Sequence, residues 1–244
     1  MIDWLRRERE EPSVTVGGRE LPIAIRRHPR ATRLTMRLAP DGSEVRVTLP
    51  RWGRTADALV FAGKRIDWLA GQLAALPSAA PPAPGGTLLF RGAELAIEWN
   101  PRLPRKPALA EDRVSLGGPV ETLAPRLRRW LEGEAQRLLG EDLAGYCERA
   151  GVAPPRLRLS RATRRWGSCS GPRDSEHCVR INWRLVQAPD LVRRSVVAHE
   201  VAHLVHFDHS PAFRVFLAGL FESDLKAADE WLKREGRRLY ASFG

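Results

Sequence analysis

The sequence predicts an α+β fold, in which a β-rich N-terminal half is followed by a mainly helical C-terminal half. Between residues 11 and 50, apolar side chains recur at nearly every second position, which is the period of half-buried strands. From residue 122 onward the apolar spacing becomes helical, and the long helix expected at 122–150 is followed by Gly151. The hydrophobic fraction of 43% is sufficient for a globular core.

The N-terminal region, residues 1–76, is expected to combine short strands with one helix. The segment 39–43, Ala-Pro-Asp-Gly-Ser, has the composition of a hairpin turn. Residues 55–76 carry apolar side chains at helical spacing, and 77–86 is rich in Pro, Ala and Gly, which is typical of a linker. The alternating runs that predict strands begin at Val14, Leu21, Leu34 and Val45.

Residues 87–120 are expected to hold further strands and an irregular segment, and residues 121–244 a helical domain with a small antiparallel sheet. Residues 166–170 are expected to form a loop, and two terminal helices to end near Tyr240. The expected strands are two within 87–99, on either side of Arg91-Gly92, and one each at 113–116, 157–160 and 178–185.

The most specific motif is His199-Glu200-Val201-Ala202-His203. On a helix, residues i and i+4 share one face about 6 Å apart, so both imidazoles can bind one metal ion. Glu200 is offset by one residue, which suits a hydrogen bond to a metal-bound water better than coordination. Roughly 0.02 such matches are expected by chance from the composition. The alternative is a pair of hydrogen-bonded histidines in the core.

A third metal ligand must come from outside this pair. His206 would lie roughly 10.5 Å beyond His199 along a helix axis, so we expect it beside the site rather than on the same ion. His209 is the expected third ligand, on condition that the helix ends near residue 206 and the chain turns back. The alternatives are Glu222 and Glu230, since some zinc hydrolases use an acid from the following helix.

The residues after 206 support such a turn. Asp208 tolerates turn conformations, and Ser210-Pro211 has the pattern of a helix N-cap followed by proline at the first helical position. A new amphipathic helix is expected at 212–220.

Five segments between residues 164 and 214 form a distinctive set: Arg165–Ser170, Arg180–Leu185, Pro189, His199–Leu204 and His209–Phe213. This set resembles the YgjP-like family of zinc metallopeptidases, which is related to the SprT-like zincins. The resemblance implies a zincin-like C-terminal half and one zinc ion on His199, His203 and His209. It further implies Glu200 as the catalytic acid/base and a peptide or protein as the substrate.

Three imidazoles leave one zinc position open, as in catalytic sites rather than closed structural ones. Two interpretations of the strand at 178–185 stay open: it binds an extended substrate along a sheet edge, or it is an ordinary core strand. An additional side chain is expected to contact the substrate or stabilise the oxyanion of the reaction. The candidates for this role are His206, His177, Arg165, Asn182 and Tyr240.

The net charge of +11 is compatible with nucleic acid or acidic proteins as partners. The basic residues are scattered, however, and no aromatic-interleaved RNA-binding motif is present. Two alternatives to a peptidase stay open: a nucleic-acid-associated protein with a structural zinc, and a zinc hydrolase of a non-peptide amide or ester. Glu200 distinguishes the first alternative, because a structural site needs no carboxylate beside its first ligand.

A cytoplasmic location without a membrane span is expected. The N-terminus is charged, and no apolar run reaches eighteen residues. The three cysteines, Cys147, Cys169 and Cys178, are too few for a disulfide framework and are expected to be packed thiols. Oligomeric state leaves no readable pattern in the sequence.

Overall fold

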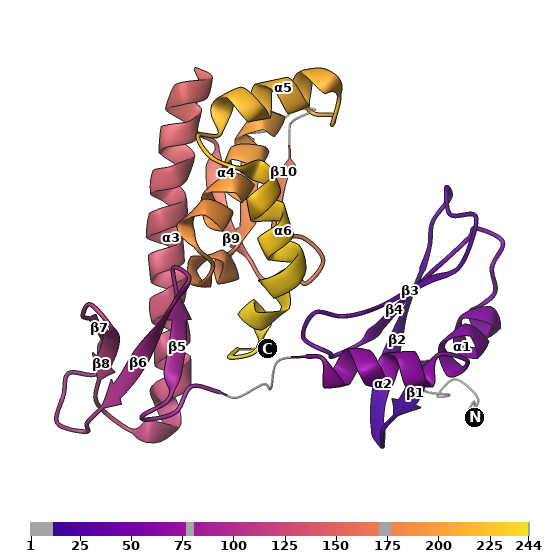
Figure 1. Cartoon of the computed structure of the whole chain (residues 1–244), viewed down its shortest axis with the longest axis horizontal. Coiled ribbons are helices and arrows are strands. Elements are labelled where there is room, and N and C mark those ends of the chain that lie inside the picture. The colour runs from indigo at the N-terminus through magenta and orange to yellow at the C-terminus, as the bar shows by residue number, and fades with distance from the viewer. Residues whose placement is uncertain (1–11, 77–80, 171–176, 244) are drawn as a thin grey trace, which may run out of the picture. The chain divides into compact units, whose positions relative to one another are not determined.

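The structure, a computed structural model, describes residues 12–76, 81–170 and 177–243. The chain divides into two compact units, Met1–Pro77 and Ser78–Gly244, which we call the N-terminal and the C-terminal unit (Figure 1). The expected regions 87–120 and 121–244 both lie in the C-terminal unit. The first residues of the expected linker, 77–80, lie outside the described residues.

The N-terminal unit is a four-stranded sheet with two helices. The sheet has the order β1-β2-β4-β3, with antiparallel outer pairs and a parallel pairing of β2 with β4. On β4, Val45, Val47 and Leu49 are buried, while the residues between them are half-buried, as the alternation predicted. The strands are β1 (Ser13–Val16), β2 (Arg19–Arg27), β3 (Thr35–Leu38) and β4 (Val45–Leu49).

The single helix expected at 55–76 is wrong, because the structure has two: α1 (Thr55–Gly63) and α2 (Ile66–Ala74). Arg65 interrupts the helical path with φ −127° and ψ 26°. Its backbone N–H closes the end of α1 by donating to the carbonyl of Ala62. The apolar spacing continues across this break, which is why the sequence alone suggested one helix.

The C-terminal unit contains a four-stranded sheet of order β5-β6-β8-β7 near one end of the long helix α3 (Leu123–Ala150), as Figure 1 shows. Helix α3 ends as expected, at Gly151 in the left-handed conformation with φ 66°. A short 3-10 turn, η1 (Val120–Thr122), precedes α3. The strands are β5 (Thr87–Phe90), β6 (Ala93–Trp99), β7 (Ala108–Leu109) and β8 (Arg113–Leu116).

The turn between β5 and β6 is fixed to the segment that leads into helix α4 (Asp190–Val205). The N–H groups of Arg91 and Gly92 donate to the carbonyls of Val186 and Gln187. At Gly92 the φ is +84°, and a Cβ atom there would lie 2.9 Å from the ring of Pro189. Only glycine combines this conformation with such a close approach.

A second sheet of the C-terminal unit has the order β10-β11-β9. The expected antiparallel sheet is wrong in part: β10 pairs antiparallel with β11, but β11 pairs parallel with β9, so the sheet is mixed. The expected loop at 166–170 is also wrong, since most of it forms β10. The strands are β9 (Arg156–Ser160), β10 (Gly167–Ser170) and β11 (Cys178–Asn182).

The strand expected at 178–185 ends early, at Asn182. The side-chain oxygen of Asn182 accepts a hydrogen bond from the N–H of Arg184, which starts the 3-10 helix η2 (Trp183–Gln187). An asparagine in this role turns the chain locally, and alternation of apolar residues does not reveal it.

Helix α4 packs against α3 through a buried ion pair. Nε of Arg193 lies 2.8 Å from a carboxylate oxygen of Asp142, and the Arg193 side chain is almost fully buried. The N-cap of α4 is Pro189, and Asp190 is the first helical residue, where its carboxylate pairs with Arg91 and Arg193. The chain continues through α5 (Pro211–Leu220), α6 (Leu225–Glu235) and the 3-10 helix η3 (Gly236–Tyr240).

Within the described residues, no helix is both long and apolar enough to cross a membrane.

Candidate metal centre

Helix α4 carries His199, Glu200 and His203, and His209 follows the end of this helix. Its buried positions include Val197, Val201 and Ala202, and they leave the His199 and His203 side chains half-buried on another face. The helix ends after Val205, because His206 adopts an extended conformation with φ −129° and ψ 107°. The chain therefore turns at this point, where the sequence suggested that it would.

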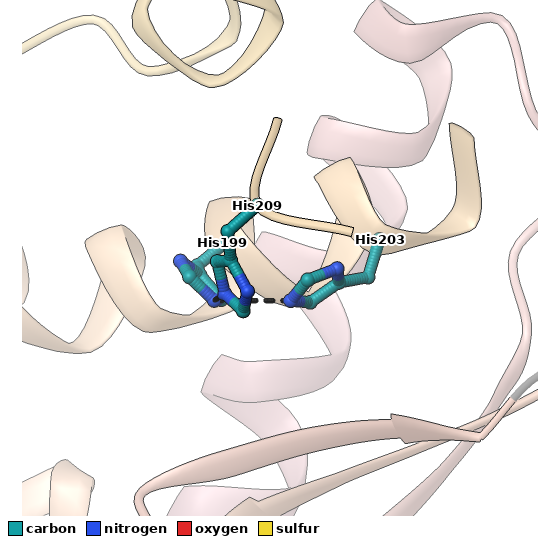
Figure 2. A group of neighbouring side chains, drawn as sticks. All are labelled: His199, His203 and His209. Carbon is teal, nitrogen blue, oxygen red and sulfur yellow. Dashed lines mark hydrogen bonds between the residues drawn. The ribbon is translucent and has the colours of Figure 1, made fainter. Parts of the chain in front are cut away.

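The turn brings His209 back over α4, as Figure 2 shows. Nε2 of His199 lies 3.2 Å from Nε2 of His203 and 3.3 Å from Nε2 of His209. In a tetrahedral zinc site with Zn–N bonds of roughly 2.0–2.1 Å, the nitrogens lie about 3.3–3.4 Å apart. The two separations from His199 match this spacing, and the three ligand atoms all lie within 4.8 Å of one another.

A backbone carbonyl orients one of the rings. Nδ1 of His203 lies 3.1 Å from the carbonyl oxygen of His206. Since a carbonyl only accepts hydrogen bonds, Nδ1 carries the proton, and the lone pair of Nε2 is left for the metal side. His206 thus acts through its backbone, while its ring packs edge-on against Phe216.

Phe213, a residue for which the sequence suggested no role, packs against all three imidazoles. Its ring centroid lies 5.1 Å from that of His199, 4.6 Å from that of His203 and 5.0 Å from that of His209. Phe213 is buried on α5, and its N–H donates to the N-cap side chain of Ser210. The N-cap at the start of α5 therefore helps to position the Phe213 ring against the three imidazoles.

Glu200 lies inside the protein between α4 and β10. Its carboxylate accepts a hydrogen bond from the N–H of Cys169, whereas its Oε2 is buried without a partner. A Cβ atom at position 167 would lie 2.3 Å from Oε1 of Glu200, so Gly167 provides the space for this side chain. A buried carboxylate oxygen without a partner is costly unless another group meets it.

Burial changes the protonation of these groups. Desolvation raises the pKa of Glu200 to about 7, although the Cys169 N–H and the charge of Arg165 oppose this shift. Desolvation lowers the pKa of His199 to about 4, and the neighbouring charges of His203 and His209 add to the effect. The pKa of His203 is lowered as well, chiefly by burial. His199 and His203 are therefore neutral at pH 7, which is the state that binds a metal.

The donor set fits a divalent metal ion such as zinc. Neutral imidazoles are favoured zinc ligands, and three protein ligands leave a position for water or substrate. Glu200, whose Oε2 is buried without a partner, lines the same pocket as His199. His199, His203 and His209 are the residues that would hold the ion.

The two acidic alternatives for the third ligand do not reach the centre. The carboxylate of Glu222 accepts from the hydroxyl of Tyr146, 2.9 Å away, and pairs with Arg149 and Arg194. Glu230 is exposed, and its partner is Lys226 at 3.9 Å.

Asn182 and Tyr240, two of the candidates for contact with the substrate or the oxyanion, both lie in the interior of the protein. Asn182 is fully buried, and its amide nitrogen donates to the carbonyl of Ala162, 2.8 Å away, and lies 3.2 Å from the Tyr240 hydroxyl. Tyr240 is also buried and packs against the ring of Trp166. Both residues hold the segment before β10 in place.

The remaining candidates lie closer to solvent. Arg165 is exposed and acts electrostatically on Glu200. The ring of His177 stacks on that of Phe207, two residues before His209 in sequence, with centroids 6.0 Å apart. Burial raises the pKa of the nearby Cys169 thiol to about 11, which disfavours the nucleophilic thiolate at neutral pH.

Comparison with known proteins gives one family. The model of the YgjP-like metallopeptidase domain matches residues 32–235 of this chain, whereas no curated protein and no solved structure matches it. The match spans most of both units, including the metal centre, and agrees with the resemblance noted from the sequence motifs. The chain belongs to the YgjP-like family, whose domain is a metallopeptidase domain.

Proposed function

We propose that this protein is a zinc-dependent peptidase, in which His199, His203 and His209 hold one ion and Glu200 is the catalytic acid/base. The observation that carries the proposal is the buried, unpartnered Oε2 of Glu200 on the helix that also supplies two of the three converging imidazoles. A purely structural zinc site would instead recruit a fourth protein ligand and has no use for such a carboxylate. The candidate group contains three ligands among the described residues.

Zinc, when bound, polarises the substrate carbonyl and makes water more acidic. Glu200 accepts the proton of the attacking water through its unpartnered oxygen and then delivers it to the leaving amine. The raised pKa of about 7 suits both steps, because the group can take up and release a proton near neutral pH. The N–H of Cys169 favours the charged carboxylate, while Oε2 has no partner of its own.

Strand β11, for which both substrate binding and a core position were open from the sequence, is the central strand of its sheet and has no free edge. The edge next to the centre belongs to β10, which pairs with β11 on one side and lies against α4. We therefore assign the extended substrate to β10, where main-chain hydrogen bonds can align a peptide beside Glu200.

The test is metal analysis and peptide cleavage with the Glu200→Gln variant. We expect one zinc per chain in both proteins and a rate about 10²–10⁴-fold lower in the variant, which is the usual contribution of a general acid/base. Glu230→Gln is the matched control, because this glutamate is exposed on α6 and pairs with the exposed Lys226. Unimpaired cleavage by Glu200→Gln would rule out the assigned role.

The same assay separates a peptidase from a hydrolase of other amides or esters. A set of peptides is compared with chromogenic esters and acyl anilides, each with and without a chelator. Zinc-dependent cleavage of peptides supports the proposal, while cleavage confined to small esters or anilides supports the alternative.

A further inference from the structure

A pocket of about 410 Å³ opens beside the metal centre. It lies within the C-terminal unit, where α4, α5, α6 and the start of β10 meet. Its volume is within the range of pockets that bind small ligands or side chains. Neither the metal ligands nor Glu200 as acid/base accounts for it.

The walls of the pocket are mainly apolar. Trp166 and Leu217 form two sides, and Leu225 and Leu232, on one face of α6, form a third. The only acidic residue of the lining besides Glu200 is Asp229, which is exposed and paired with Lys233. Apart from Glu200, the lining described here therefore offers no unpaired acidic group to a charged ligand, and it is suited to an apolar group.

The pocket lies on one particular side of the centre. His199 and Glu200 belong to its lining, whereas His203 and His209 do not. Ser195 and Val196, about one helical turn before His199, extend it along α4. A peptide bond held at the centre would therefore place one of its two flanking side chains in the pocket.

The position of Glu200 in the lining indicates which of the two flanking side chains enters the pocket. A group that protonates the leaving amine must lie on the side of the residue that supplies this amine. We propose that the pocket binds a large apolar side chain, such as Leu, Met or Phe, of the residue that follows the scissile bond. This inference rests on the proposed peptidase function and adds a substrate preference to it.

The first test measures cleavage by the zinc-loaded full-length chain. Peptides that differ only in the residue after the scissile bond are compared, with Leu, Phe, Ala, Ser or Glu in that position. We expect kcat/KM for Leu and Phe to exceed that for Ser and Glu by about 10- to 100-fold, the discrimination typical of an apolar pocket. Cleavage without such a preference would overturn the inference.

A substitution in the wall makes the test specific. Leu225→Phe narrows the pocket and is expected to move the preference from Phe towards Ala. Val215→Phe is the matched control, because Val215 is exposed on α5 and is not part of the lining. A change of preference in the control alone, or an unchanged preference in Leu225→Phe, contradicts the assignment.

A second measurement does not depend on activity. In metal-free protein with labelled leucine methyl groups, N-acetyl-leucinamide is titrated and compared with N-acetyl-serinamide by NMR. We expect shifts of the Leu217, Leu225 and Leu232 methyls with the leucine compound only. If no peptide is cleaved, the peptidase proposal fails while this titration still decides the pocket. Equal shifts for both compounds, or none, overturn the pocket.

Discussion

The carboxylate of Glu200 occupies the space that a side chain at Gly167 would need. A Cβ atom on Gly167 would lie 2.3 Å from Oε1 and 2.8 Å from Cδ of Glu200. Strand β10 and helix α4 can therefore approach closely only with glycine at position 167. This glycine belongs to the Trp-Gly-Ser-Cys segment of the family motif. The space that it leaves for the carboxylate explains why glycine stands at this position of the segment.

We predict that Gly167→Ala displaces Glu200 and lowers peptide hydrolysis by about 100-fold, since a shift of about 1 Å in a catalytic group can have this effect. Zinc content should stay at one ion per chain, because the three imidazoles are not touched. Parallel zinc analysis and cleavage assays check this. Gly219→Ala is the control, because nothing lies within 4 Å of a Cβ there. A fully active Gly167→Ala would contradict the steric argument.

His209 and His206 are predicted to differ sharply when each is replaced by alanine. His209→Ala removes a ligand atom and should weaken zinc binding by more than about 100-fold, beyond the 10–100-fold typical of an outer partner. His206→Ala keeps the backbone carbonyl that meets His203 and should retain zinc. Competition with a chromogenic chelator measures both. Equal losses would show that the His206 ring, not its carbonyl, matters.

Phe213 is predicted to contribute both to the stability of the fold and to the affinity for zinc. Phe213→Ala removes a buried ring and should lower the free energy of unfolding by about 3–5 kcal/mol. Because the same ring contacts all three imidazoles, zinc affinity should fall as well. Phe216→Ala, on the same helix, is the comparison, since its ring contacts only His206 among the histidines. Urea unfolding and metal titration check both effects.

Glu200 is predicted to make the metal-free protein less stable as the pH rises. Its pKa is about 7 in the fold against an ordinary 4.5, so between these values the folded chain holds a proton that the unfolded chain has released. The stability contributed by the protonated group is therefore present below pH 4.5 and is lost as the pH rises through 7. The expected loss is on the order of 3 kcal/mol.

His199 has the opposite effect on the pH dependence of stability, so the test compares the wild type with a Glu200 variant. Its pKa is about 4 in the fold against an ordinary 6.5, and stability is lost as the pH falls through this range. Glu200→Gln leaves His199 in place. Urea unfolding of the two metal-free proteins should therefore show the variant gaining on the wild type between pH 5 and pH 8. A difference that stays constant with pH would refute the prediction.

Several features of the fold were predictable because their causes are local. Gly151 closes α3, and Ser210-Pro211 starts α5, as expected from capping and proline preferences. The helical pair His199 and His203 follows from i, i+4 spacing, which any α-helix imposes. The family was also recognisable from the motifs alone, and the family model agrees.

Other expectations about the fold were wrong because the features concerned do not depend on the pattern of apolar residues. The break between α1 and α2 depends on the backbone of one residue, Arg65, and the early end of β11 on the side chain of Asn182. The loop expected at 166–170 became a strand because it pairs with β11, a long-range contact that local preference cannot show.

The sequence by itself determined which side chains are suited to a metal centre: two imidazoles and a carboxylate on one helix, and a third imidazole at His209 on condition that the chain turns back after about residue 206. Tertiary structure alone decided how His209 meets the other two, that Gly167 and Cys169 hold Glu200, and that β10 rather than β11 is the edge strand. The reason is physical, since spacing along one helix fixes distances within that helix, whereas distances between elements depend on how they pack.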